Sequence, residues 1–271
     1  MKKLTEQKYW ESKYKSNESG LTHNAYKSNL PHVIERLLVP YMHSNQINLI
    51  TENISVKENS KIVEIGSAPG YFVCELAEIL KIEPYGVEYS ENGAKVNREV
   101  FKMHGFNEEN VIYADFFSED FLKSHENFFD IVISRGFIEH FDSPENAVSA
   151  HLRILKKNGY IAVIVPNKTG INRFLSLFFN KDSLHMHNLR IMHIDEFENI
   201  FPRNKVSKIL AKYFGIFDLY QFNPSLSRKR IHSLAMKLQK VLYILYRMKP
   251  KSMNLDSRIF SPMLIFVGRK L

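Results

Sequence analysis

Cysteine is nearly absent from this chain. Cys74 is the single cysteine among 271 residues, so no disulfide can form within the chain. We therefore expect a reducing, cytoplasmic compartment, with Cys74 packed in the core. Long apolar runs are missing too, since none approaches the ~18 residues that a membrane-spanning helix needs. The polar residues that follow Leu4 argue against a signal peptide.

Acidic residues are scarce in the last part of the chain. Residues 203–271 hold 15 Lys and Arg but only Asp218 and Asp256, a net charge of +13, whereas residues 1–202 carry a net charge of −5. A basic segment on an acidic body predicts an acidic partner, such as an anionic substrate, a membrane surface or nucleic acid. The alternative is a solvated basic surface with no partner.

No phosphate-binding motif follows the first predicted strand, although a glycine turn does. Residues 61–71 read KIVEIGSAPGY, a β-branched strand that ends in a turn and passes at once into a helical pattern. Gly66 and Gly70 lack the spacing of a dinucleotide site, Pro69 removes a backbone donor, and no Lys-Ser/Thr pair follows. Glu88 ends the next predicted strand, 22 positions after Gly66, where an acid binds ribose hydroxyls. The sequence therefore predicts a site for a nucleoside without a phosphate.

This segment resembles motif I of the class I S-adenosylmethionine-dependent methyltransferases, commonly E/D-x-G-x-G-x-G. The resemblance implies that Glu64 lies near the methionine end of S-adenosylmethionine, that the glycines pass beneath the cofactor, and that Glu88 holds the ribose. Ala68 stands where the central glycine is usual. S-adenosylhomocysteine would be the product. The cofactor contacts implied in this way, including those of later strand ends, are Glu64, Gly66, Ser67, Ala68, Gly70, Glu88, Tyr89, Asp115, Phe116 and Arg135.

Asp115 and Phe116 follow the third predicted strand. The family uses this position to bind adenine: the carboxylate accepts from the exocyclic amine, and the next residue offers its N–H and an apolar wall. The alternative is that Asp115 caps the next helix.

The alternation of strand and helix patterns, read with the resemblance, predicts an α/β fold. We expect a Rossmann-like, doubly wound sheet of seven mostly parallel strands, with the last strand antiparallel. Strands are expected near 61–65, 84–88, 110–113, 129–134, 159–165, 215–222 and 261–268, and helices near 70–81, 91–104 and 144–156.

An N-terminal helical cap is expected over residues 1–55, before a methyltransferase domain over 56–271. Its helices are predicted near 3–17 and 31–52, with a break near Pro40. The family often has an aromatic helix here that closes over the cofactor. For the aromatic residues of this segment, core packing is the favoured prediction: Tyr9, Trp10 and Tyr14.

The loop after the fourth strand is where the carboxyl edge of an open sheet places chemistry. Its sequence from Ile138 to Pro144, IEHFDSP, resembles a stretch of the ubiquinone- and menaquinone-type branch, which methylates small metabolites. His140 has an intrinsic pKa suited to taking a proton from an acceptor hydroxyl, with Glu139 beside it. Alternatively, Glu139 and His140 only brace the loop.

A nucleic-acid substrate is disfavoured. The glycine turn is shared with the heat-shock rRNA 2′-O-methyltransferases, but Arg135 stands where those enzymes carry an aspartate. The Asn/Asp-Pro-Pro-Tyr/Phe motif of adenine or amide methylation does not occur in the sequence.

An apolar, aromatic insertion over 167–194 predicts a lid over the acceptor. Its phrase H-N-L-x-I-M resembles methyltransferases of surface-polysaccharide or secondary-metabolite pathways. His185, His187 or His193 could bind the acceptor or act as a base. Their spacings match neither a helical histidine pair nor a Cys/His site, so no metal is expected.

A second insertion, 223–257, contains a predicted basic amphipathic helix over 228–249. Such a helix packs on its own domain, pairs with a second copy to form a homodimer, or lies on an anionic membrane. We favour the first two. An exposed apolar face on this helix would instead favour the membrane.

The sequence thus predicts a cytoplasmic methyltransferase that acts at an oxygen of a small molecule. The favoured acceptor is a sugar, a sugar phosphate or a related surface-glycan or secondary-metabolite precursor. The alternatives are a lipid-quinone methyltransferase at a membrane surface and a non-catalytic protein that kept the cofactor pocket.

Overall fold

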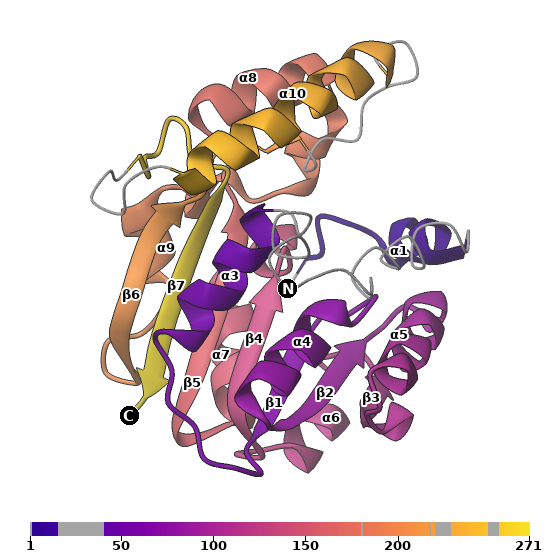
Figure 1. The fold of residues 1–271 in the computed structure, drawn as a ribbon. Coiled ribbons are helices and arrows are strands. Elements are labelled where there is room, and N and C mark those ends of the chain that lie inside the picture. The colour runs from indigo at the N-terminus through magenta and orange to yellow at the C-terminus, as the bar shows by residue number, and fades with distance from the viewer. Residues whose placement is uncertain (1, 16–40, 180, 217, 220–228, 249–254) are drawn as a thin grey trace.

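A seven-stranded sheet forms the centre of the molecule (Figure 1). The computed structural model describes residues 2–15, 41–179, 181–216, 218–219, 229–248 and 255–271. The strand order is β3-β2-β1-β4-β5-β7-β6, and β7 runs antiparallel to both of its neighbours. The predicted sheet is confirmed, including its antiparallel last strand. The strands are β1 Lys61–Ile65, β2 Glu83–Glu88, β3 Val111–Tyr113, β4 Phe129–Arg135, β5 Leu155–Pro166, β6 Val206–Phe214 and β7 Met263–Lys270.

The sixth strand lies earlier than predicted. The apolar residues near 215–222 suggested a strand, but β6 ends at Phe214, and Gly215 follows with a φ of 89°. β6 forms one end of the sheet. An edge strand tolerates lysines because they discourage further pairing, and Lys208 and Lys212 both lie on β6. Its sequence therefore lacks the apolar run by which the buried strands were found.

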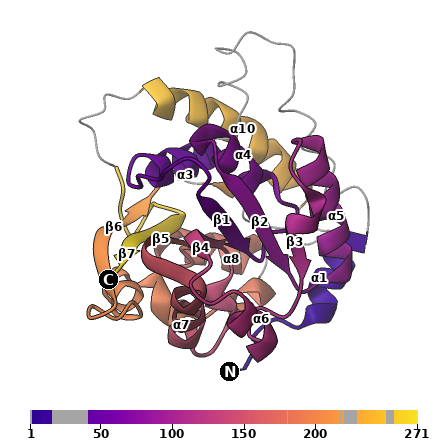
Figure 2. The ribbon, with the colours of Figure 1, turned by 90° about the horizontal axis from the view of Figure 1, so that it is seen from below.

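Helices cover both faces of the sheet, as Figure 2 shows. On one face, α3, α4 and α5 supply buried side chains such as Ile50, Phe72 and Phe101. On the other, α6, α7 and α9 supply residues such as Val148 and Phe197. The central strands are buried on both faces, as expected of parallel strands with helices on each side. The helices of these two layers are α3 Tyr41–Thr51, α4 Tyr71–Leu80, α5 Glu91–Met103, α6 Glu119–Ser124, α7 Pro144–Ile154 and α9 Ile194–Asn199.

The described part of the N-terminal segment contains two helices, α1 and α3. α1 (Gln7–Lys15) has no buried residue and contacts α5, whereas α3 packs on α4 and belongs to the core. The predicted helix over 31–52 is described only from Tyr41, and the expected break near Pro40 lies outside the described residues.

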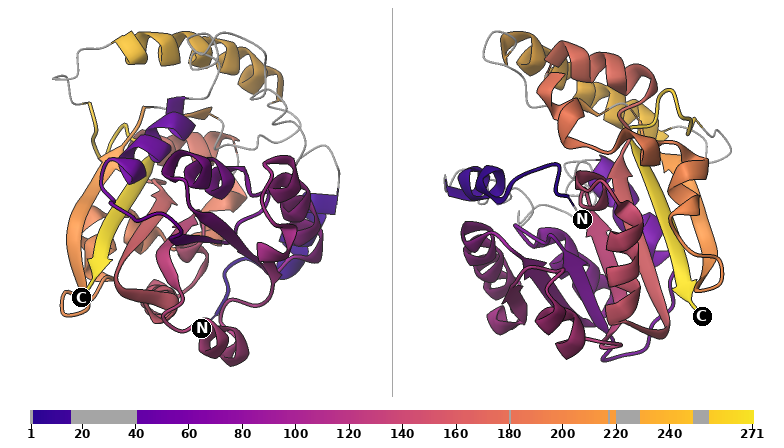
Figure 3. Two further views of the ribbon diagram at one scale, coloured as in Figure 1. Left: turned by 60° about the horizontal axis from the view of Figure 1, so that its bottom comes forward. Right: turned by 180° about the vertical axis from the view of Figure 1, so that it is seen from behind.

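The two insertions form helices that lie side by side above one end of the sheet (Figures 1 and 3). α8 (Gly170–Phe179) and the short helical turns Lys181–Met186 and Leu189–Met192 occupy the predicted lid. α10 (Lys229–Met248) is the predicted basic helix. None of the described helices combines the length and the apolar character that a membrane crossing requires.

Candidate functional site

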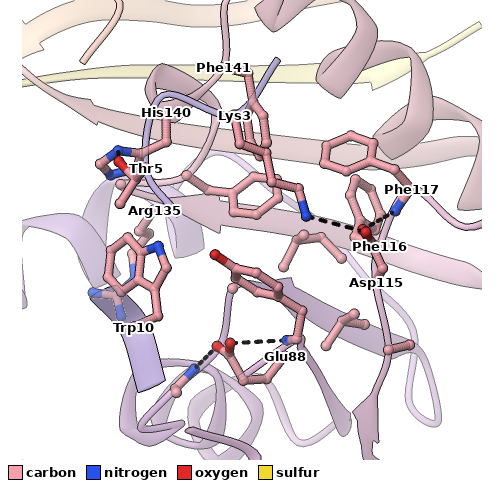
Figure 4. A pocket seen from close by; sticks show the side chains of 18 of the residues that line it. Lys3, Thr5, Trp10, Glu88, Asp115, Phe116, Phe117, Arg135, His140 and Phe141 are labelled. Atoms are coloured by element: carbon pink, nitrogen blue, oxygen red, sulfur yellow. Dashed lines mark hydrogen bonds and ion pairs between the residues drawn. The ribbon is translucent and has the colours of Figure 1, made fainter. Parts of the chain in front are cut away.

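A pocket opens where the carboxyl ends of β1, β2 and β4 meet (Figure 4). Open α/β sheets bind ligands at this edge, where neighbouring strands lead to helices on opposite faces. The first helix, α1, closes the pocket from the other side. Its lining comprises Lys3, Thr5, Trp10, Lys13, Tyr14, Ile65, Gly66, Ala68, Val87, Glu88, Tyr89, Ala114, Asp115, Phe116, Phe117, Arg135, Gly136, Phe137, His140 and Phe141.

The glycine turn is tied to the neighbouring strand by its backbone. The N–H groups of Gly66 and Ser67 both donate to the carbonyl of Val87, at 2.9 and 3.2 Å. Gly66 has a φ of 71°, and an added Cβ there would stand 3.0 Å from the ring of Phe137. Gly70 starts α4 with a φ of 103°. These positions require glycine because a side chain would meet both backbone strain and neighbouring atoms.

Glu88 lies at the end of β2 with its buried carboxylate on the pocket wall. Burial raises its pKa, while backbone bonds act in the opposite direction. Those bonds come from the N–H groups of Tyr89 at 3.0 Å and Ser90 at 2.9 Å to one oxygen, and of Ala68 at 3.3 Å to the other. A carboxylate can accept about four hydrogen bonds. Capacity therefore remains for a donor in the pocket.

Glu64 lies behind the pocket wall rather than in its lining. Its carboxylate accepts from Nε of Arg135 at 2.9 Å. The Arg135 guanidinium also stacks on the ring of Phe72, 3.6 Å from its centroid, and donates to Gln46 at 3.2 Å. The motif acid thus fixes Arg135, and Arg135 forms the surface that a ligand meets.

Asp115 and Phe116 lie on the opposite wall of the pocket. Asp115 accepts from the backbone N–H of Phe117 at 3.1 Å and pairs with the ammonium of Lys3 at 3.2 Å. Ser118, not Asp115, caps the next helix, which removes the capping alternative. Phe116 is buried and lines the pocket, and its contact with adenine stays a prediction.

α1 contributes aromatic side chains to the pocket, so the prediction of core packing for them was wrong. Trp10 and Tyr14 line the pocket, and Tyr14 donates its hydroxyl to the Ala68 carbonyl at 2.9 Å. Tyr9, on the same helix, is exposed. The cluster of aromatics before the first strand was a usable signal, but its role depends on where α1 docks.

Glu11 holds α1 in this place. Its carboxylate accepts from the N–H groups of Glu91 at 2.7 Å and Asn92 at 3.2 Å, at the first turn of α5. A carboxylate is stabilised at a helix N-terminus because the N–H groups there have no partner within the helix. Gln7 adds a bond to the carbonyl of Tyr89 at 2.8 Å.

His140 lines the pocket in the loop after β4. Its Nδ1 lies 2.8 Å from the carbonyl of Met186 and 2.8 Å from the hydroxyl of Thr5. Because a carbonyl only accepts, Nδ1 carries the hydrogen and Nε2 keeps its lone pair. Burial is the main cause that lowers the pKa of His140 to about 3, and its electrostatic interaction with His187 acts in the same direction. The imidazole is therefore neutral at physiological pH.

Glu139 is fully buried beside His140 and does not line the pocket. Neither of its carboxylate oxygens has a hydrogen-bond partner among the described residues. Burial raises its pKa to about 8, and the charge of Lys168 acts in the opposite direction. Lys168 is buried as well, which lowers its pKa to about 8. Glu139 thus lies behind the pocket wall, and both its catalytic role and its bracing role stay predictions.

Of the three lid histidines, His187 is the one that reaches the site. Its ring centroid lies 4.8 Å from that of His140, whereas His185 is exposed and lies outside the pocket lining. His193 stands at the start of α9. Donor atoms of Glu139, His140 and His187 lie within 4.8 Å of one another, a grouping that could accommodate a cation. Sequence spacing could not reveal this grouping, because His187 lies in the lid, far along the chain from Glu139 and His140 in the loop after β4.

The pocket joins a buried acid with free acceptor capacity, a glycine turn and aromatic walls, without a phosphate-binding loop. This set fits a cofactor that contains a nucleoside but no phosphate.

Comparison with known proteins is consistent with a cofactor site of this kind. The family model described as a methyltransferase domain matches residues 41–213. No curated protein matches the chain significantly.

Solved structures share the fold at low identity. Geranyl diphosphate C-methyltransferase from Streptomyces coelicolor A3(2), in complex with Mg²⁺, geranyl diphosphate and S-adenosyl-L-homocysteine, has a TM-score of 0.61 and 12% identity, and the match covers 98% of each chain. The MccD protein has a TM-score of 0.57 at 14% identity, covering 86% of this chain and 99% of that one. The cyclase SpnF has a TM-score of 0.53 at 13% identity, covering 83% and 80%. At these identities, the similarity shows the fold alone.

Proposed function

This chain belongs to the methyltransferase domain family, with S-adenosylmethionine as its cofactor, and we propose that it methylates an oxygen of a small-molecule acceptor. The proposal rests on one observation: a neutral imidazole, that of His140, lines the cofactor pocket with Nδ1 held by a carbonyl. When bound, S-adenosylmethionine supplies an electrophilic methyl group on a sulfonium, which the acceptor oxygen attacks in line.

The pocket residues would hold the cofactor in parts. Glu88 would accept from the ribose hydroxyls, Asp115 and Phe116 would bind the adenine, and the glycine turn would lie beneath the methionine part. Arg135, neutralised in part by Glu64, would face the same part. Trp10 and Tyr14 would cover the ligand and exclude water.

His140 would take the proton that the acceptor hydroxyl loses. A pKa of about 3 makes it a weak base. A weak base is sufficient, because the hydroxyl becomes strongly acidic as its oxygen bonds to the methyl carbon. Thr5 and Met186 hold the ring in one orientation, and Nε2, which lies 3.9 Å from a carboxylate oxygen of Glu139, would accept the proton.

The acceptor class proposed is a sugar, a sugar phosphate or a related surface-glycan or secondary-metabolite precursor. Support comes from the lid, which reaches the site through Met186 and His187, and from its resemblance to methyltransferases of such pathways. The exposed apolar face of α10 favours a second candidate, an acceptor at a lipid surface.

A His140→Ala variant tests the catalytic role. We expect turnover to fall by ~10²-fold or more, while the dissociation constant of S-adenosylhomocysteine changes by less than about threefold. His185→Ala is the matched control, since His185 is exposed and outside the pocket. A His140 variant within a few-fold of the parent rate would leave His140 a positioning role only. Cofactor binding without methylation of any acceptor would favour the non-catalytic alternative.

A further inference from the structure

Large apolar side chains are exposed along α10. The most exposed described examples are Met248 at 75%, and Leu234 and Leu238 at 64% each. They recur at the three- and four-residue intervals of one helix face. We call this set, with the exposed residues of α8, the apolar face: Phe174, Leu177, Phe178, Ile231, Leu234, Leu238, Val241, Leu242, Ile244, Leu245 and Met248.

The other side of α10 is anchored to the protein. The Gln239 side chain accepts from the N–H of Leu219 at 3.1 Å, and the Tyr243 hydroxyl donates to Asp218 at 2.8 Å. Tyr246 packs on Tyr41 of α3, with ring centroids 4.9 Å apart. The orientation of α10 is therefore set by polar and aromatic contacts, and it turns leucines outward.

α8 lies against α10 (Figures 1 and 3). The ring of Phe179 lies 5.4 Å from that of His232, and Phe179 packs with Ala235 and Met236. Phe174, on the exposed side of α8, is 68% accessible. Soluble monomers rarely expose apolar patches on two neighbouring helices without a partner.

The charged residues within α8 and α10 have one sign. α8 and α10 contain no aspartate or glutamate, whereas they carry six cationic side chains: Arg173, Lys229, Arg230, Lys237, Lys240 and Arg247. Apolar side chains with lysine and arginine beside them match a bilayer surface with anionic headgroups, because the headgroups attract the cations and the acyl boundary accepts the leucines.

A second copy of the chain fits this surface less well. Symmetric dimers place the same patch of both subunits face to face. Two such patches would bring cations against cations with no acid on either pair of helices, and like charges at an interface oppose association.

We propose that α8 and α10 dock this protein on an anionic membrane surface. The consequence of this docking for catalysis rests on the proposed function, since the docked lid leads directly to the proposed active site. Met186, whose carbonyl holds His140, is the last residue of the short helix Lys181–Met186 that comes after α8. An acceptor carried by the membrane would thus arrive beside the same lid.

Vesicle flotation of the full-length protein tests the proposal. We expect flotation with phosphatidylcholine vesicles that contain phosphatidylglycerol, at least tenfold weaker flotation with phosphatidylcholine alone, and release at high salt. The double variant Leu234→Ser/Leu238→Ser should lower the flotation at least tenfold. The control Ile79→Ser changes an apolar residue that is 51% exposed on α4 and should float as the parent does.

A second pair of variants tests whether the positive charges of α10 contribute to flotation. Arg230→Gln/Lys237→Gln should weaken flotation severalfold, whereas Lys57→Gln/Lys102→Gln, which removes two exposed charges elsewhere, should not. Equal flotation with neutral and anionic vesicles, or no flotation, would overturn the proposal. So would a dimer in light scattering that the leucine variant dissociates, since the occupant would then be a second copy.

Calorimetry with S-adenosylhomocysteine separates this proposal from the proposed function. All these variants should bind the cofactor product as the parent does, because none of the changed residues lines the pocket. A variant that does not bind S-adenosylhomocysteine would have a folding defect. A parent protein that does not bind it would contradict the proposed function but not the docking surface.

Discussion

Replacing Glu88 by glutamine tests how the cofactor is held. The change keeps the shape of the side chain and removes its charge. Two of its three backbone bonds, from Tyr89 and Ser90, end on one oxygen and can persist on the amide oxygen. The third, from Ala68 at 3.3 Å, would face an amide NH₂ group and be lost.

The size of the effect follows from these contacts. A hydrogen bond to a charged acceptor contributes about 1.5–3 kcal/mol, so loss of the ribose contact of Glu88 should raise the dissociation constant of S-adenosylhomocysteine by roughly 10- to 100-fold. The lost bond from Ala68 should lower the free energy of unfolding by about 1–2 kcal/mol, which leaves the protein folded.

Isothermal titration calorimetry measures the affinity, and urea denaturation measures the stability. Glu83→Gln is the matched control, because Glu83 lies at the exposed start of the same strand and should leave the affinity unchanged. A dissociation constant for the Glu88 variant within twofold of the parent would show that the ribose contact lies elsewhere.

Three other outcomes are expected. Gly70→Ala should lower the free energy of unfolding, measured by urea denaturation, by about 2–4 kcal/mol, because residue 70 has a φ of 103° and an added Cβ would lie 2.1 Å from the side-chain oxygen of Asn97. The control Gly105→Ala has a φ of 79° and nothing within 4 Å of the added Cβ, so it should lower the free energy less. Equal losses for the two variants would contradict the steric argument. Burial lowers the pKa of His151 to about 4. Below the ordinary pKa of histidine, the unfolded chain therefore binds a proton at this residue that the folded chain does not bind. Between pH 7 and pH 5, the free energy of unfolding should fall by about 2 kcal/mol more for the parent than for His151→Gln. Trp10 is the only tryptophan of the chain and lines the pocket, so intrinsic fluorescence should change saturably with S-adenosylhomocysteine, and an unchanged spectrum at saturation would place the ligand away from α1.

Local sequence patterns predicted the framework of the cofactor site. The run from Ile62 to Ile65, the glycine turn and Glu88 follow one another within one strand–helix–strand unit, so the geometry of that unit brings them together without reference to the rest of the chain. Strand β7 could also be predicted from local sequence, because its apolar residues form a continuous run.

Other features of the site depend on how separate segments of the chain dock on one another. Trp10 and Tyr14 face the pocket because Glu11 binds the start of α5, a contact across the chain that periodicity does not encode. His187 rather than His185 lies beside His140 because the lid folds back across the loop after β4. The amino-acid pattern shows that the basic helix is amphipathic. Which of its faces is exposed follows from the way the chain packs, since Gln239, Tyr243 and Tyr246 contact the rest of the protein and the leucines on the opposite side are exposed.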